Sequence, residues 1–513
     1  MLAGLFQPVS ENWEHIRTIV LERYVKNTLV LLGAVGLVTA SVGTFLSWSL
    51  TQYDFKWNQV KMSLLLLPLA IPPYIGGYVY GGIFNYSGTL ERIFRSLGWA
   101  PIHIDMLSMS GAIFVFSIFL MPYVILVTRG FFYRLPASYF ESARLLGHSR
   151  FQTFFRVILP MSRGVIAGGT VLVLLEVLND YGLVRYFGVP VFSTAIYSAW
   201  FGLGDVQSAI RLAMILMGIV FVVLFTEQKL TQSIPTVPAK ADARIRRRNK
   251  PSKWLWWSFH SVYFLYLGAG VLIPVAQLLA WSKMASKQVI MRGLPSLIGN
   301  TLKLGLIVTV GVILCGLIIG NYQRLKNNFW GRFYSKLVVL GYSIPAPIIA
   351  VAVLLFFVQV DQSLQGTYQW LGLKNAFLTG SLFLLIFALT LRYMAIGYNS
   401  LSAGFNRIGR RYYDAARTLG ASGWRSFWHV DFPMLKPAIF SAILLTFVDV
   451  LKELPLTLIL RPFNFDTLAT RVFTYAGDEM IHEASVYALL IIGVSGLALI
   501  TMQAIQKRRK SYD

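Results

Sequence analysis

Apolar runs about as long as a bilayer is thick alternate with short polar stretches along almost the whole chain. A helix needs roughly 20 apolar residues to cross the hydrocarbon core, and lipid leaves an open backbone without hydrogen-bond partners, which favours helices. The pattern therefore predicts an all-α polytopic membrane protein. We expect about eleven transmembrane helices, near 29–50, 62–84, 107–128, 164–180, 208–226, 255–282, 303–321, 337–360, 376–393, 435–452 and 485–505.

The second part of the chain repeats the first at a constant offset. The polar segment from Tyr139 to Gly147 recurs from Tyr412 to Gly420, 273 positions later. Other matches at this offset span most of each half and include Asn27-Thr28-Leu29 with Asn300-Thr301-Leu302, Ile71-Pro72 with Ile344-Pro345, and Pro160-Met161 with Pro433-Met434. A single offset kept over such a length indicates a duplicated unit. We therefore predict two similar halves fused in one chain.

Composition agrees with this class, since 56% of the residues are hydrophobic and only 13% are charged. The net charge of +24 comes from basic clusters in loops between spans, among them Arg246 to Arg248, Arg324 to Lys336 and Lys507 to Lys510. Lys and Arg in short loops mark the cytoplasmic side of a membrane. A basic chain can also bind nucleic acid, but these clusters lie beside spans and no separate domain is present to hold it.

This orientation places both copies of the repeated polar segment on the cytoplasmic side. Six spans separate the two copies, so the halves are parallel and not inverted as in many secondary transporters. The count requires that 182–206 and 455–479, which contain charges, do not cross the membrane. We expect a first half at 1–228, a basic cytoplasmic linker at 229–254 and a second half at 255–513. The span at 255–282 has no counterpart in the first half, so either the start is short or an upstream helix is absent from this chain. With eleven spans and a basic, cytoplasmic C-terminus, we expect the N-terminus outside.

Local signals predict a helix, a glycine bend and a second short helix in each polar segment. Ser138 and Glu141 have the spacing of a capping box. Gly147 and Gly420 suit a left-handed residue that ends a helix. Serines then follow to cap the second helix, and Pro160 and Pro433 lead into the next span. One copy could be an interfacial hairpin that only anchors its neighbours, but two copies on one side favour a partner with twofold pseudo-symmetry.

The repeated segment resembles the EAA coupling loop of ABC-importer permeases. The matching residues in the first copy are Glu141, Ala143, Gly147, Leu159 and Pro160, and those in the second copy are Ala415, Ala416, Gly420 and Pro433. The departures are Ser142, Val157, Asp414 at the glutamate position, Val430 and Phe432. The resemblance implies that each loop docks into a cytoplasmic ATPase subunit and transmits its closure.

The two-domain architecture, with Tyr186 to Phe192 in one half and Lys452 to Thr470 in the other, resembles that of the fused permeases of ferric-iron importers. This resemblance covers nearly the whole chain. Such a permease takes Fe(III) from a periplasmic binding protein and is driven by an ATPase dimer, in the bacterial inner membrane. Thiamine, polyamines and phosphonates are alternative cargoes, because related permeases carry them. A secondary transporter driven by an ion gradient is the alternative from another class.

Four carboxylates are candidates for a cation path. Glu176 and Asp180 lie four positions apart on one helix face, and Asp449 and Glu453 repeat this spacing. Hard cations such as Fe(III) suit carboxylate and phenolate oxygens, and Tyr181 and Tyr186 follow nearby. Polyamines would suit the same lining, and the carboxylates could instead pair with basic residues and only brace the halves.

Prolines interrupt spans at matching places in the two halves. Pro72 and Pro345 are candidate hinges, because a proline removes a backbone hydrogen bond and kinks a helix. Static bends are the alternative interpretation.

The chain carries no sequence signal of an enzyme. It lacks a Gly-x-x-x-x-Gly-Lys-Ser/Thr loop, so we expect ATP to be used by a partner subunit and no cofactor to be bound by this chain. Its single cysteine, Cys315, excludes an internal disulfide, and the six histidines show no ligand spacing, so no static metal site is predicted.

Overall fold

The computed structural model describes residues 10–100, 104–232, 250–285, 287–326, 328–370 and 378–510. These residues form helices joined by short connections, with no strand among them, which confirms the predicted all-α class. Contacts divide the chain into two compact units, one of Phe6–Lys283 and the other mainly of Met284–Asp513. Most of the predicted linker and the first nine residues lie outside the described residues.

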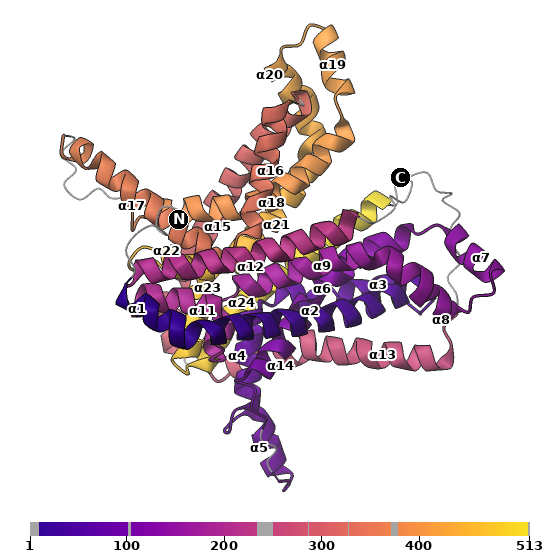
Figure 1. The fold of residues 1–513 in the computed structure, drawn as a ribbon, viewed down its shortest axis with the longest axis horizontal. Helices are drawn as coiled ribbons and strands as arrows, with labels where there is room; N and C mark the ends of the chain where they lie inside the picture. The colour runs from indigo at the N-terminus through magenta and orange to yellow at the C-terminus, as the bar shows by residue number, and fades with distance from the viewer. Residues whose placement is uncertain are drawn as a thin grey trace. The chain divides into compact units, whose positions relative to one another are not determined.

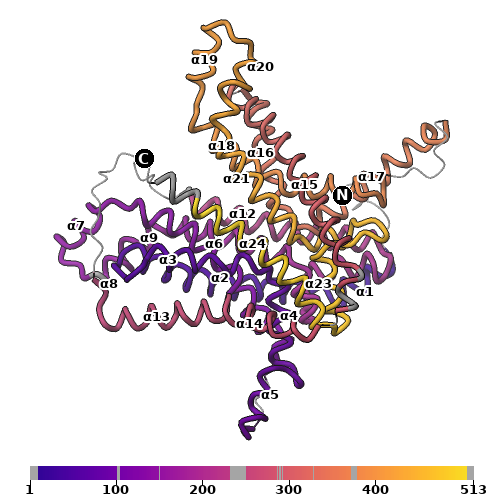
Figure 2. The backbone as a smooth tube through the Cα atoms, turned by 180° about the vertical axis from the view of Figure 1, so that it is seen from behind, coloured from indigo at the N-terminus to yellow at the C-terminus, as the bar shows by residue number. Residues whose placement is uncertain are grey.

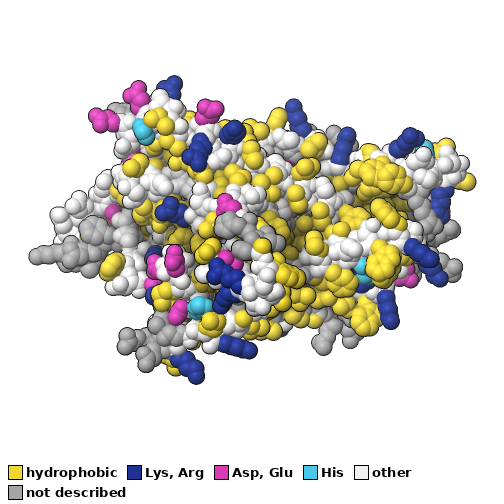
Figure 3. Space-filling model, turned by 90° about the horizontal axis from the view of Figure 1, so that it is seen from below, with side chains coloured by type: hydrophobic (Ala, Val, Ile, Leu, Met, Phe, Trp, Pro, Cys, Tyr) yellow, Lys and Arg dark blue, Asp and Glu magenta, His cyan; other side chains and the backbone are white. Residues whose placement is uncertain are grey.

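The described residues contain ten helices long and apolar enough to cross a membrane, or eleven with one bent pair. This agrees with the prediction of about eleven spans. The face in Figure 3 carries broad areas of hydrophobic side chains between scattered charged ones, as a lipid-exposed surface requires. The two segments expected not to span hold only short helices, α10 (Gly182–Tyr186), α11 (Phe192–Tyr197), η5 (Ser198–Gly202), α22 (Pro455–Leu460) and α23 (Leu468–Gly477).

The unit formed by the first part of the chain is built around four long helices. They are α2 (Leu21–Gln52), which continues α1 (Glu11–His15) and η2 (Ile16–Val20), then α6 (Met109–Arg134), α9 (Leu159–Asn179) and α12 (Val206–Gln232). Helix α2 packs against α6 and α9, and α12 packs against α9, so the four run side by side (Figure 1). Close contacts at small residues support this packing, since a Cβ on Gly43 would lie 3.2 Å from Val124.

The predicted span at 62–84 is a broken helix and not a straight one. Helix α3 (Asn58–Leu64) and η3 (Leu67–Ala70) end before Ile71, and α4 (Pro73–Phe84) and α5 (Thr89–Ser96) then continue at an angle of 85°. In the other unit α16 (Phe329–Ser343) ends just before Pro345 and α17 (Ala346–Trp370) follows. Both breaks therefore occur at the predicted prolines, because a proline disfavours a helical conformation in the residue before it.

The first helix of the predicted second half packs with the first unit. Helices α13 (Lys253–Leu267), η6 (Gly268–Leu272) and α14 (Ile273–Ser282) lie along α2 to α4 (Figure 2). The phenols of Tyr263 and Tyr266 each donate a hydrogen bond of 3.3 Å, to the carbonyls of Lys61 and Leu65 respectively. The contact boundary at 283–284 thus differs from the boundary at 255 expected from the repeat.

The unit formed by the second part of the chain has an equivalent bundle. Helices α15 (Lys287–Leu325), α18 (Leu382–Ile408) and α21 (Phe432–Leu451) pack against one another, with α16 on α18 and α24 (Ile481–Lys510) on α21 and α23. Its core gathers apolar residues of α15, α17 and α18, including Val308, Val312, Ile349 and Leu385. A Cβ on Gly397 would lie 2.3 Å from Val312, so the close crossing of α15 and α18 requires glycine there.

The repeated Asn-Thr pair makes equivalent hydrogen bonds in both units. Asn27 Nδ2 donates to the carbonyl of Pro190 at 3.0 Å, and Thr28 Oγ1 accepts from Phe192 N at 3.3 Å. Asn300 Nδ2 donates to the carbonyl of Asp466 at 3.2 Å, and Thr301 Oγ1 accepts from Leu468 N at 2.9 Å. Each pair ties a long helix to the connection that follows the short non-spanning helix.

Candidate coupling segments and transport site

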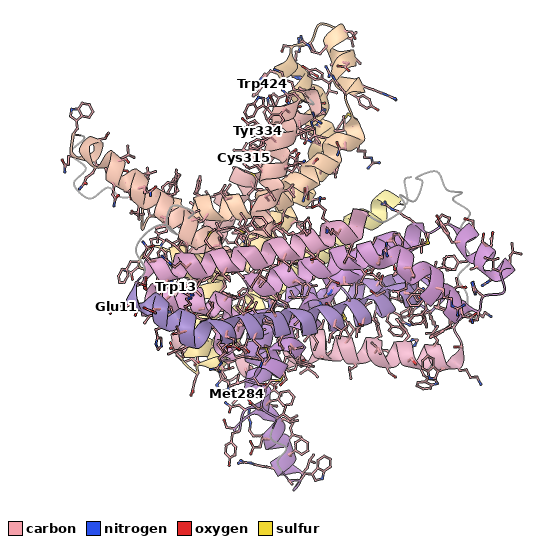
Figure 4. The ribbon with its side chains drawn as sticks, in the orientation of Figure 1. Glu11, Trp13, Met284, Cys315, Tyr334 and Trp424 are labelled. Atoms are coloured by element: carbon pink, nitrogen blue, oxygen red, sulfur yellow. The ribbon has the colours of Figure 1, made fainter. Side chains whose placement is uncertain are left out.

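Each repeated polar segment forms the predicted pair of short helices. The first coupling segment consists of α7 (Ala137–Leu145), α8 (Arg150–Thr153) and η4 (Phe154–Ile158). The second consists of α19 (Arg411–Thr418), α20 (Gly423–Ser426) and η7 (Phe427–Asp431). Each lies at one end of its own bundle, and Figure 4 shows Trp424 of the second segment at the end of the helices that carry it.

Gly147 and Gly420 end the first helix of each segment in the left-handed conformation, with φ of +77° and +83°. Two backbone hydrogen bonds close each turn: Gly147 N to Arg144 O at 2.9 Å with His148 N to Ala143 O at 3.0 Å, and the same pair between Gly420 and Arg417 and between Ala421 and Ala416. This is the Schellman pattern. The predicted glycine bend is confirmed in both copies.

Serine caps start the second helix of each segment. Ser149 Oγ accepts from Gln152 N and Ser422 Oγ accepts from Arg425 N, each at 3.2 Å. The capping box predicted at Ser138 and Glu141 is wrong, because the helix begins at Ala137 and its cap position is Pro136. The proline side chain has no hydrogen-bond acceptor, so this helix begins without a side-chain cap.

A π-helical turn precedes the proline in both halves. It covers Phe154–Ile158 before Pro160 and Phe427–Asp431 before Pro433, and both prolines occupy the first turn of the following long helix. Each proline lacks the N–H that would continue the regular bonding pattern of the helix. In both halves the predicted proline therefore follows a π-helical turn and lies in the first turn of a long helix.

The outward face of each segment carries apolar side chains at equivalent positions. Leu146 is 77% exposed and Leu419 is 88% exposed, while Phe151 and Trp424 are 72% and 74% exposed. Glu141 is exposed, and Asp414 forms an exposed ion pair with Arg410 at 3.2 Å. Ala143 is buried and Ala416 is half-buried. Two matching apolar faces at helix bends are surfaces suited to a partner.

Two of the four candidate carboxylates cap the short non-spanning helices. Asp180 Oδ1 accepts from Leu183 N at 2.8 Å at the start of α10. Glu453 accepts from Leu456 N at 2.8 Å and Thr457 N at 3.0 Å at the start of α22. The repeated spacing therefore has a structural use. Contact with a cargo stays a prediction.

The other two carboxylates lie nearby on the preceding long helices. Asp449 pairs with Lys452 at 2.6 Å, and both side chains are 22% exposed. Glu176 is half-buried and lies close enough to Asp180 for their charges to interact. Among the described residues no group of three or more His, Cys, Asp or Glu side chains could hold a metal ion.

The structure adds aromatic and basic side chains that the sequence reasoning did not select. Tyr78 is buried, with its ring 4.5 Å from that of Tyr186 and 5.9 Å from that of Tyr74. The spacing of Tyr74 and Tyr78 by four positions could have shown this pair. Arg392 lies in the middle of α18 and is only 5% exposed. The predicted span at 376–393 placed this residue at a helix end.

Comparison with known proteins decides the family. The profile of the family described as binding-protein-dependent transport system inner membrane component matches residues 40–226 and 312–512. The chain belongs to this family. Each matched region contains one coupling segment, which agrees with the fusion of two permease domains.

Several relatives cover nearly the whole chain. It is 22% identical over 93% of its length to the Fe(3+)-transport system permease protein FbpB 2 of Haemophilus influenzae, of which the match spans 88%. It is 23% identical, again over 93% of its length, to the ferric transport system permease protein FbpB of Actinobacillus pleuropneumoniae, covering 68% of that protein. A 2-aminoethylphosphonate permease of Salmonella typhimurium matches 40% of the chain at 25% identity.

These findings confirm the resemblance to the fused permeases of ferric transport systems. The chain is a multi-pass membrane subunit of an ABC-type importer, and its relatives are named as transport-system permeases.

Proposed function

We propose that this chain moves ferric iron from a periplasmic binding protein to the cytoplasm, driven by a dimeric ATPase that docks on the two coupling segments. The observation that carries the coupling part is the repeat of one detailed geometry: a Schellman turn, a serine-capped helix and a π-turn before a proline in each half. The exposed apolar face on each segment supplies a docking surface for one ATPase subunit.

The iron part rests on two kinds of support. The relatives that match over 93% of the chain are named as ferric permeases, whereas the phosphonate permease matches over 40% of it. The chain also places hard oxygen ligands, the carboxylates of Glu176 and Asp180 and the phenol of Tyr186, at one end of α9 and in α10. Fe(III) is the cargo in this proposal and makes transient contacts without a resident site.

The proposed mechanism is alternating access. The coupling segments and the C-terminus face the cytoplasm, and the connections around α10 and α22 face the binding protein. Closure of the ATPase dimer on ATP draws the two coupling segments together. Each segment continues through its π-turn into a long helix, α9 or α21, so its displacement moves the helix that carries the carboxylates at its other end. The cargo enters when the halves open outward and leaves inward after hydrolysis.

The cargo assignment is tested by uptake of radioactive iron in iron-limited cells with and without this gene, with thiamine, spermidine and 2-aminoethylphosphonate uptake in parallel. Selective loss of ferric uptake supports the proposal. Normal iron uptake with loss of another substrate would keep the importer and replace the cargo.

A further inference from the structure

A buried ion pair holds the second coupling segment to its bundle. Arg324, near the end of α15, donates from Nη1 to Asp431 Oδ1 at 2.8 Å and from Nη2 to Asp431 Oδ2 at 2.5 Å. The Asp431 side chain is fully buried and that of Arg324 is 6% exposed. Asp431 is the last residue of the π-turn η7, one residue before α21 begins.

The same guanidinium contacts two further elements. It lies over the ring of Phe405 in α18, 5.1 Å from the centroid, and over that of Tyr413 in α19 at 5.9 Å. Arg324 Nη2 also donates to Asn321 Oδ1 at 3.0 Å, and Arg410, at the start of α19, donates to the carbonyl of Leu325 at 3.3 Å. One arginine thus joins both ends of the coupling segment to the bundle.

The first half has uncharged side chains at the equivalent positions. At the offset of 273 residues, Asp431 corresponds to Ile158 and Arg324 to Thr51. Ile158 is fully buried, and the Thr51 hydroxyl bonds within its own helix to the carbonyls of Ser47 and Trp48.

An aromatic cluster holds the first coupling segment instead. The Trp48 ring, at the position of Asn321, lies 5.1 Å from Phe132, 6.0 Å from Phe140 and 4.8 Å from Phe154. Phe132 and Phe140 are the equivalents of Phe405 and Tyr413. The two halves therefore share the architecture of this junction and differ in its chemistry.

The junction itself does not require an ion pair, but the ion pair gives it directional hydrogen bonds. The first half shows that apolar packing is sufficient to form such a junction. A buried ion pair gives little net stability compared with apolar residues, but removing one partner leaves a costly buried charge. Its two hydrogen bonds are directional and fix the orientation of the groups they join.

We propose that Arg324 and Asp431 are positioning residues that fix the second coupling segment to α15, α18 and α21, so that its displacement reaches these helices. The two coupling segments are then held in different ways, and the second relies on a bidentate ion pair that the first lacks. The link to transport rests on the proposed function, whereas the anchoring itself does not.

The anchoring is tested on the purified full chain by amide hydrogen exchange. We expect Asp431→Asn and Arg324→Met each to accelerate exchange across residues 411–431 by roughly tenfold or more, as loss of a buried contact requires. Exchange across 137–158 should not change. The control is Lys436→Met, which removes an exposed charge one turn further along α21. Unchanged exchange in 411–431 in both variants would overturn the proposal.

The positioning role is tested in the complete importer by the amount of iron transported per ATP hydrolysed. We expect the single variants to lower this ratio about fivefold or more, within the usual range of coupling effects. The double variant Arg324→Met with Asp431→Leu removes both charges and should recover the wild-type unfolding temperature while its ratio stays low. Two outcomes would show a merely structural role. In the first, the double variant recovers the wild-type amount of iron transported per ATP hydrolysed. In the second, the single variants yield less assembled complex but leave this amount unchanged.

Failure of the two proposals can be told apart. If the wild-type importer transports no iron, the proposed cargo fails, while the exchange result on the purified chain still decides the anchoring. If iron transport is normal and exchange in 411–431 is unaffected by the variants, the ion-pair proposal alone fails.

Discussion

Single residues with special backbone geometry define the coupling segments. Gly147 and Gly420 occupy the left-handed region, where a β-branched side chain is strained, with no other atom within 4 Å of an added Cβ. The cost of substitution therefore comes from the backbone alone.

We predict that Gly147→Val and Gly420→Val each destabilise their own segment by about 1–2 kcal/mol or more. Recovery of a co-expressed ATPase with the tagged chain should fall, and most strongly in the double variant. Gly33→Val is the matched control, because Gly33 is an exposed helical residue with equally open space and no positive φ. Equal ATPase recovery in all variants would contradict the assignment of these bends.

Thr28 and Thr301 accept hydrogen bonds from backbone N–H groups, which an apolar side chain could not do. We predict that Thr301→Val lowers the free energy of unfolding by about 1–3 kcal/mol, because Leu468 N loses its buried acceptor. Thr309→Val is the control on the same helix, since its buried hydroxyl has no hydrogen-bond partner among the described residues. Thermal unfolding in detergent measures both, and a larger effect at Thr309 would refute the interpretation.

The residue-level predictions that are confirmed rest on local signals, although the equally local capping box at Ser138 and Glu141 is wrong. The glycine bends and the serines at 149 and 422 follow from a few neighbouring residues. The Arg324–Asp431 pair joins residues 107 positions apart. Its counterparts in the other half, Thr51 and Ile158, are uncharged, so comparing the two copies of the repeat does not reveal the ion pair.

Several short helices at the ends of the long ones begin at side-chain caps, and the coupling segments also carry exposed apolar faces. The sequence predicted the coupling helices from their repeated pattern. It assigned Asp180 and Glu453 to a cargo path because intramembrane carboxylates favour function. Their role as helix caps depends on the backbone path after each span, which hydropathy does not reveal.

The apolar face of each coupling segment should carry the contact with the ATPase. We predict that Leu146→Asp and Leu419→Asp each weaken ATPase binding about tenfold or more, since each places a charge in a desolvated contact. The unfolding temperature of the chain alone should not change, because both side chains are exposed. Leu37→Asn, at a 71% exposed position within α2, serves as a control for added polarity. Binding unaffected by both substitutions would exclude this face as the docking surface.

The carboxylates can be separated into caps and cargo contacts. We predict that Glu453→Ala destabilises the chain by about 1–3 kcal/mol, because Leu456 N and Thr457 N lose their acceptor. Asp449→Asn should cost no more than about 1 kcal/mol, since its pair with Lys452 is partly exposed. Unfolding temperature and transport are measured together. A variant that keeps its stability and loses transport identifies a cargo contact.

At the scale of the molecule, two duplicated halves have kept their architecture and changed their chemistry. The fold class, the span count and the fusion of two units follow from hydropathy and the constant offset. The packing of α13 and α14 with the unit of Phe6–Lys283 could not be predicted, because the repeat assigns them to the second half. It depends on tertiary contacts such as those of Tyr263 and Tyr266 with α3 and its C-terminal end.

The central claim is that this chain is a permease powered through its coupling segments. The most direct measurement is uptake of ferric iron into proteoliposomes containing the chain, its ATPase and the loaded binding protein, with each component and ATP omitted in turn. We predict transport only when all are present, and its loss with Gly147→Val and Gly420→Val combined. Uptake by the chain alone, driven by an ion gradient, would contradict the account.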